Sequence, residues 1–100
     1  MEIARQQWAE GHRRLSAKRG DPELYRLLLD QVEAIMDELR RRIGANYSLA
    51  DLADGYRDAD RWTRDAVAEG APGMQWGPEV TAAADAAFYL YARGARDYEP

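Results

Sequence analysis

The chain has no cysteine, which excludes disulfide bonds, thiolate chemistry, and zinc or iron–sulfur sites held by cysteine. His12 is its single histidine, so the chain cannot supply the paired Glu-x-x-His motifs that bind two iron ions in some helical bundles. No pairing of a nucleophile with a base is visible in the sequence. We therefore expect a protein that is not an enzyme and that uses neither a metal ion nor a cofactor.

Long hydrophobic runs are also missing. The longest covers only residues 86–92, whereas a helix that spans a bilayer needs ~20 apolar residues. Residues 1–7 are mostly polar and lack the apolar segment of a signal peptide. From these features we expect a cytoplasmic protein that does not bind membranes.

Positive charge is in deficit, because 18 Asp and Glu outnumber 14 Lys and Arg and give a formal net charge of −4. Proteins that bind phosphate backbones rely on a positive face, so the charge argues against nucleic acid as the partner. The chain is 46% hydrophobic, which is enough to form a core. Its length of 100 residues fits a single helical domain over residues 1–100.

Apolar side chains recur every three to four residues through most of the chain, and no stretch shows sustained strand-like alternation. We predict an all-α fold, in the form of a small antiparallel bundle of three to four helices. The predicted helices cover residues 2–18, 22–43, 48–69 and 79–93, with an irregular loop over residues 70–78.

Local signals set several of these boundaries. Asp21 is a good N-cap, and Pro22 follows at the first helical position, where its missing N–H costs nothing. Ser48 and Asp51 form a pattern similar to a capping box at the start of the next helix. The helix that begins after Asp21 has a broad apolar face, and we expect it to be the spine of the domain.

One segment resembles the opening of a helix–turn–helix unit, because the Leu-x-x-Leu-Ala pattern of such units occurs within residues 48–53 and follows three arginines at 40–42. The match is degenerate, since Arg57 stands where the motif normally has glycine. The segment that would read DNA, residues 57–65, holds as many aspartates as arginines. A small transcription-related DNA-binding protein is therefore an alternative function and not the first choice.

Asp85 interrupts the otherwise nearly apolar segment 81–88. A buried carboxylate there would need an arginine or several hydrogen-bond donors, and could then be a polar anchor for a pocket or interface, paired with Arg61 or Arg64. Acidic residues are seldom buried, so we expect instead that Asp85 faces solvent along one polar strip of its helix.

The three tryptophans and six tyrosines exceed what a core of this size readily holds, and Trp, Tyr and Arg dominate the energetics of protein interfaces. We predict a non-enzymatic interaction or regulatory module whose partner is another protein, expected to be a second copy of the chain. The predicted contact residues are Trp8, Trp62, Trp76 and Tyr98, with Arg61 and Arg64 at the rim.

A third possible function is the binding of a small molecule between the helices predicted over residues 48–69 and 79–93. Such a pocket would be lined by Trp62, Trp76, Tyr89 and Asp85.

Overall fold

The computed structural model describes residues 2–70 and 77–99. Within these two ranges the chain is helical apart from short turns, and no strand occurs. The all-α prediction is therefore confirmed for the described residues. The helices are α1 (Glu2–Ser16), the 3₁₀ turn η1 (Ala17–Gly20), α2 (Pro22–Ile43), α3 (Leu49–Arg57), α4 (Ala59–Gly70) and α5 (Pro78–Ala92).

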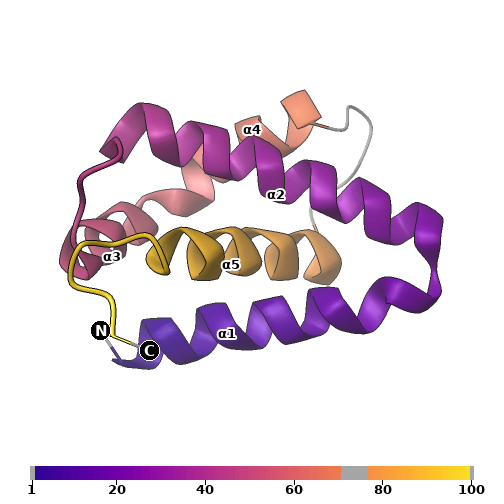
Figure 1. Cartoon of the computed structure of the whole chain (residues 1–100). Coiled ribbons are helices and arrows are strands. Elements are labelled where there is room, and N and C mark those ends of the chain that lie inside the picture. The colour runs from indigo at the N-terminus through magenta and orange to yellow at the C-terminus, as the bar shows by residue number, and fades with distance from the viewer. Residues whose placement is uncertain (1, 71–76, 100) are drawn as a thin grey trace.

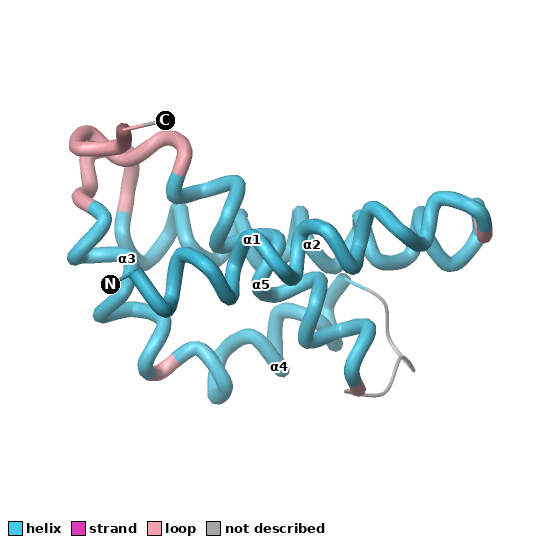
Figure 2. The backbone as a smooth tube through the Cα atoms, turned by 90° about the horizontal axis from the view of Figure 1, so that it is seen from below, coloured by secondary structure: helices cyan, strands magenta, loops and turns pink. Residues whose placement is uncertain are grey.

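Helix α5 is the centre of the molecule. Figure 1 shows it between α1 and α2, with α1 running antiparallel to both, while α4 lies behind α2. In the view from below, α3 and α4 lie on one side of α5 (Figure 2). Ten of the α5 residues are buried, most of them alanine, and small side chains allow neighbouring helices to approach closely. The large side chains of the core therefore come mainly from the helices around α5.

Helix α2 forms as its local signals predict. The Asp21 carboxylate accepts a hydrogen bond from the backbone N–H of Leu24 at 3.3 Å, which satisfies one of the free donors at the helix start. Pro22 occupies the first turn. Gly44 ends the helix with φ of 82°, a conformation that glycine adopts without a steric penalty. The boundaries at 22 and 43 are those expected from the sequence.

The single helix predicted over residues 48–69 is wrong, because this segment forms two helices, α3 and α4, that meet at Asp58. The N–H of Asp58 bonds back to the carbonyl oxygens of Gly55 and Tyr56, which closes the end of α3. Glycine and aspartate are weak helix formers, so ending the helix at this point costs little free energy. The change of direction lets α3 pack against the end of α5 while α4 packs along α2.

The other helix ends differ by one or two residues or by helix type. The α-helix of α1 ends at Ser16 and continues as the 3₁₀ turn η1, whereas one helix to residue 18 was expected. Helix α5 covers Pro78–Ala92 rather than 79–93. The predicted loop over 70–78 overlaps the end of α4 at Gly70 and the start of α5 at Pro78. Its residues 71–76, including the predicted contact residue Trp76, lie outside the described residues.

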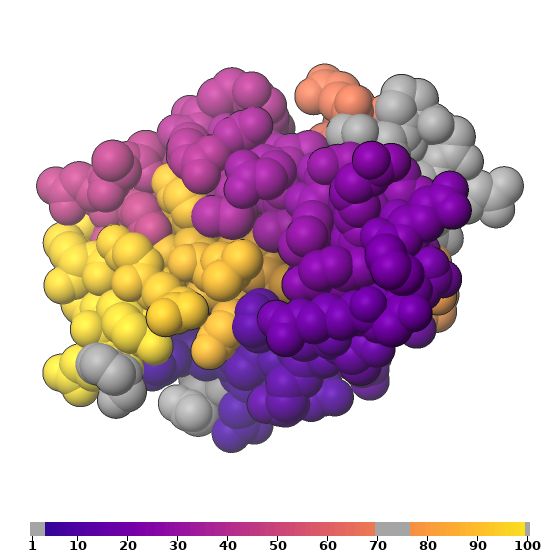
Figure 3. Space-filling model, turned by 45° about the vertical axis from the view of Figure 1, so that its right-hand side comes forward, coloured from indigo at the N-terminus to yellow at the C-terminus, as the bar shows by residue number. Residues whose placement is uncertain are grey.

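The segment after α5 packs back onto the bundle. The N–H of Arg96 donates to the carbonyl of Tyr47 at 2.9 Å, and the Asp97 carboxylate accepts from the N–H of Leu49 at 2.8 Å. The Tyr47 and Tyr91 rings stack with centroids 4.4 Å apart. In Figure 3 this segment, in yellow, lies between the α3 region and α1.

Among the described residues, no helix combines the length and the apolar character that crossing a membrane requires.

Candidate functional site

A groove lies where the C-terminal end of α2 meets α3 and α4, and we call it the Trp62 groove. It consists of two adjoining hollows of about 470 and 270 Å³ that share Arg42, Asp58 and Trp62. Ile43 and Gly55 complete its apolar surface. The remaining lining residues are all charged and comprise Asp51, Asp54, Arg61 and Asp65.

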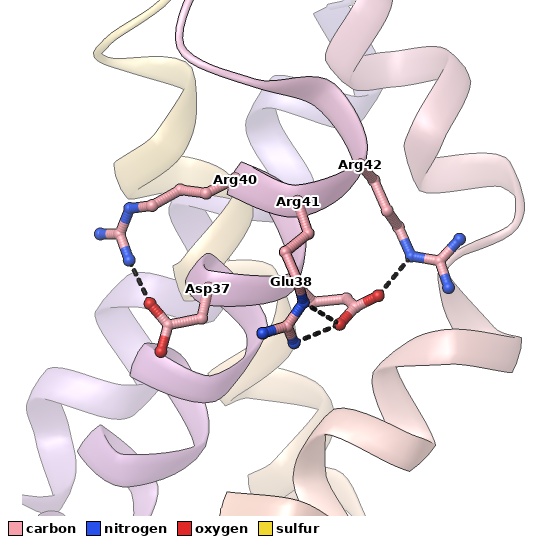
Figure 4. Close-up of polar contacts among 5 residues, drawn as sticks. All are labelled: Asp37, Glu38, Arg40, Arg41 and Arg42. Carbon is pink, nitrogen blue, oxygen red and sulfur yellow. Dashed lines mark hydrogen bonds and ion pairs between the residues drawn. The ribbon is translucent and has the colours of Figure 1, made fainter.

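Arg42 is held over the ring of Trp62 by two contacts. Its guanidinium carbon lies 5.1 Å from the ring centroid, within the range of a cation–π interaction. Its Nε donates to Glu38 at 2.8 Å. Figure 4 shows Arg41 and Arg42 converging on the Glu38 carboxylate, while Arg40 pairs separately with Asp37.

Glu38 holds Arg41 and Arg42 in place, because its carboxylate accepts hydrogen bonds from both. Its side chain is only 19% exposed, and the hydrogen bond from Arg41 is the main cause that lowers the pKa of its carboxyl group, with Arg42 contributing in the same direction. A carboxylate bonded by two guanidinium groups stays charged and fixed. Arg42 therefore has a defined position at the edge of the groove.

The lining of the groove is acidic, because its four aspartates outnumber its two arginines and leave a net charge of −2. Three of these aspartates have arginine neighbours, Asp51 with Arg96 at 3.8 Å, Asp54 with Arg57 at 3.6 Å and Asp58 with Arg61 at 3.7 Å. All six side chains are more than half exposed, and ion pairs of this kind contribute little to stability. These carboxylates can therefore exchange their partners for those of an incoming molecule at low cost.

The structure places the predicted contact residues in different environments. Trp62 lies in the groove but is only 7% exposed, and Arg61 and Arg64 are exposed on the same helix. Trp8 is 1% exposed, so it is a core residue and its ring is not available at the surface. The reason is that α1 packs along α5, so that Trp8 stacks on Phe88 with centroids 5.5 Å apart.

Trp8 and Tyr98 line a second hollow between α1, α5 and the C-terminal segment. Tyr98 is half-buried there and lies beneath the guanidinium group of Arg5, 6.0 Å from its ring centroid. The predicted aromatic contact residues that the structure describes are therefore divided between two hollows.

The expectation that Asp85 faces solvent is wrong. Asp85 is 6% exposed, and its carboxylate accepts a hydrogen bond from the hydroxyl of Tyr56 at 2.7 Å. Helix α1 covers it, because Gly11 has no side chain and its backbone approaches α5 at this point. Neither Arg61 nor Arg64 is the partner that the sequence suggested, because both are exposed on α4.

Burial raises the pKa of Asp85, against the smaller opposing effects of Tyr56 and Arg14. Burial and the bond to Asp85 together raise the pKa of Tyr56. A folded-state pKa above the unfolded one means that folding favours the neutral acid. The contribution of Asp85 to stability is therefore most favourable at acidic pH, and it declines as the pH rises from the unfolded pKa through the folded one.

We expect that Asp85→Asn raises the free energy of unfolding at pH 7 by about 1 kcal/mol, because asparagine is neutral and still accepts the Tyr56 hydrogen bond. The gain should shrink at pH 4, where the native carboxyl group is itself increasingly neutral. Urea denaturation of both proteins at the two pH values measures this. An equal gain at both values would show that the charge of Asp85 is not the cause.

The contacts of α3 and α4 do not favour the nucleic-acid alternative. Only Asp58 separates the two helices, whereas a helix–turn–helix unit has a turn of about three or four residues. Arg57 and Arg61 lie beside Asp54 and Asp58, so this surface carries as much negative as positive charge. The pocket suggested as a third function does not form as predicted either, because Trp62 and Tyr89 line different hollows and Asp85 is buried.

Glu38, Tyr56 and Gly11 were not predicted as functional residues, and Arg42 was considered only as one of the three arginines of the DNA-binding alternative. The spacing of Glu38 and Arg42 by four residues could have indicated the ion pair. A glycine within an amphipathic helix could have indicated a close helix contact at residue 11.

Among the residues that the structure describes, no three histidine or acidic side chains lie close enough together to hold a metal ion. Comparisons of the chain with known protein families, with curated proteins and with solved structures found no match.

Proposed function

We propose that this chain is a non-enzymatic interaction module that self-associates head to tail, with the Trp62 groove of one copy receiving the α1–α2 turn of the next. The observation that carries the proposal is the groove itself, which has an apolar floor at Ile43 and Trp62 and an acidic rim. Apolar floors within charged rims are typical of protein interfaces. A groove of this kind favours a partner segment that is both basic and apolar.

The chain carries such a segment at its other end. In Figure 1 the turn between α1 and α2 lies at the opposite end of the long axis from α3. We define the turn surface as Arg19, Tyr25, Arg26 and Leu29. Leu29, at 38%, is the only large hydrophobic residue among those described that is classed as exposed.

The two arginines of the turn surface support its fit to the groove. Arg19 lies over the ring of Tyr25 at 5.9 Å and bonds its hydroxyl at 3.4 Å. Within the described residues, neither Arg19 nor Arg26 forms an ion pair with a carboxylate. Their charges are therefore open to the aspartates of a second molecule, and the contact should weaken with salt because it is formed between exposed charges.

This arrangement differs from a two-fold dimer, because the two contact surfaces are different and lie far apart on one molecule. Contacts of this type build open chains or closed rings. The molecule measures 35 Å along its longest axis and 19 Å along its shortest, so each added copy would lengthen an assembly along the axis of α2.

Two charge-reversed variants test the proposal. The groove variant carries Asp54→Lys and Asp58→Lys, and the turn variant carries Arg19→Glu and Arg26→Glu. All four side chains are exposed, so folding should be preserved, as circular dichroism can verify. Light scattering across a hundredfold dilution at low salt should show the native chain forming assemblies larger than a dimer, and each variant alone as a monomer.

Mixing the two variants gives the decisive result. Each retains one intact surface, so the mixture should form a one-to-one complex and grow no further. As a control, Asp60→Lys with Glu69→Lys reverses two exposed charges of α4 outside the groove and should leave assembly unchanged. A native chain that stays monomeric at all concentrations, or a groove variant that assembles fully, would contradict the proposal.

A further inference from the structure

The second hollow, which we call the Arg5 pocket, has a volume of about 250 Å³. It lies between the first half of α1, the end of α5 and the C-terminal segment. It is lined by Arg5, Gln6, Trp8, Ala9, Tyr89, Ala92 and Tyr98. Its wall is thus aromatic and aliphatic, with one cation and one amide at the edge.

Among the described residues, Arg5 is the only charged one in the lining. Its guanidinium group bonds the carbonyl oxygen of Glu99 at 3.4 Å and lies over the ring of Tyr98. Among residues 4–69 and 77–99, no carboxylate pairs with it, whereas Arg13, Arg41 and several other arginines have such partners. Arg5 therefore places a positive charge next to the apolar walls of the pocket.

The floor of the pocket is held rigidly. Trp8 stacks on Phe88, and Tyr56 meets it edge-on with centroids 5.5 Å apart. The ring of Tyr89 contacts the ring of His12, with centroids 4.7 Å apart. Side chains that are held in place before binding lose little entropy when a ligand arrives, so the site is preformed.

From this geometry we infer that the Arg5 pocket binds a small organic acid, with the carboxylate on Arg5 and an aromatic or short aliphatic body against the half-buried rings of Tyr89 and Tyr98. A guanidinium group suits a carboxylate because it offers two parallel N–H donors. The exposed amide of Gln6 supplies a further donor at the edge. The volume is below the usual range of about 300–1,000 Å³ for ligand sites, which limits the ligand to a single ring or its equivalent.

This inference concerns a different surface from the Trp62 groove and goes beyond self-association. Benzoate is a suitable probe, and benzyl alcohol has the same ring without the charge. In an NMR titration of the full chain, benzoate should shift the backbone amides of residues 5–9, 89–92 and 98 with an affinity in the millimolar range. Benzyl alcohol should bind about tenfold more weakly or worse.

Two substitutions distinguish specific binding in the pocket from nonspecific attraction of anions to arginine side chains. Arg5→Gln should weaken benzoate about tenfold and leave benzyl alcohol nearly unchanged. Arg13→Gln is the control, because Arg13 is an exposed arginine of the same helix that lines neither this pocket nor the Trp62 groove and lies outside the turn surface. It should leave benzoate binding unchanged.

A third variant tests the volume of the pocket. Ala9→Leu places a larger side chain in the lining at a partly exposed position, so the fold should persist while both probes lose their binding. Equal binding of the two probes, equal loss in the Arg5 and Arg13 variants, or no shift of the pocket amides at saturating benzoate would each overturn the inference.

Discussion

Replacing Trp8 with alanine is expected to lower the free energy of unfolding by about 4 kcal/mol. The ring is 1% exposed and contacts the rings of Phe88 and Tyr56. Its removal leaves a large cavity between α1 and α5, and it also loosens Tyr56, which donates the hydrogen bond to Asp85. Urea denaturation followed by circular dichroism measures the loss. A cost below about 1 kcal/mol would place Trp8 outside the core.

Trp8→Phe is the matched control for this prediction. The indole Nε1 of Trp8 is the one buried side-chain polar atom among the described residues for which no hydrogen-bond partner is found. Phenylalanine retains most of the stacking on Phe88 and removes this unpaired donor, whose burial carries a cost. We therefore expect Trp8→Phe to cost less than half as much as Trp8→Ala. Equal costs would show that the indole N–H makes an essential contact.

Gly11→Ala is expected to destabilise the fold by about 3 kcal/mol, although alanine is the better helix former. A Cβ atom at residue 11 would lie 2.3 Å from the Cβ of Asp85 and 3.0 Å from the carbonyl oxygen of Ala82. Both are fixed atoms close to the α5 backbone, so the two helices would have to separate. Separation of the helices would also expose the buried Asp85 to solvent. The same denaturation experiment measures the effect.

Gly20→Ala provides the comparison. Nothing lies within 4 Å of a Cβ atom built at this position, and its φ is not in the left-handed region. This substitution should leave stability nearly unchanged or raise it slightly, because alanine reduces the freedom of the unfolded chain. If Gly11→Ala were as harmless as Gly20→Ala, the close approach of α1 to α5 would be wrong.

Local signals in the sequence were sufficient for α2. Asp21, Pro22 and Gly44 act through their own hydrogen bonds and backbone preferences, within a few residues of each other along the chain. The N-cap at Ser48 was equally accessible, because the full capping box with Asp51 is present. The same sequence did not reveal the break at Asp58. Whether residues 49–70 form one helix or two depends on which other helices α3 and α4 contact.

The burial of Asp85 and Trp8 also could not be predicted from the sequence, because it depends on contacts between residues that are distant along the chain. The polar strip of α5 would face solvent if no helix covered it, and only the packing of Gly11, distant in sequence, decides that α1 does so. The apparent surplus of aromatic residues has a related origin. Helix α5 is thin because most of its buried residues are alanine, so the rings of Trp8 and Trp62 fill the space around it instead of remaining at the surface.

The pairing of α1 with α5 also governs how the chain can fold during its synthesis. These helices share the most extensive contact of the bundle, yet Trp8 leaves the ribosome long before Phe88. Closing a loop of this length costs entropy before the contacts repay it. Folding therefore cannot be completed until α5 has emerged, and the apolar faces of α1 and α2 stay uncovered for most of translation, when partly folded chains are most prone to aggregate.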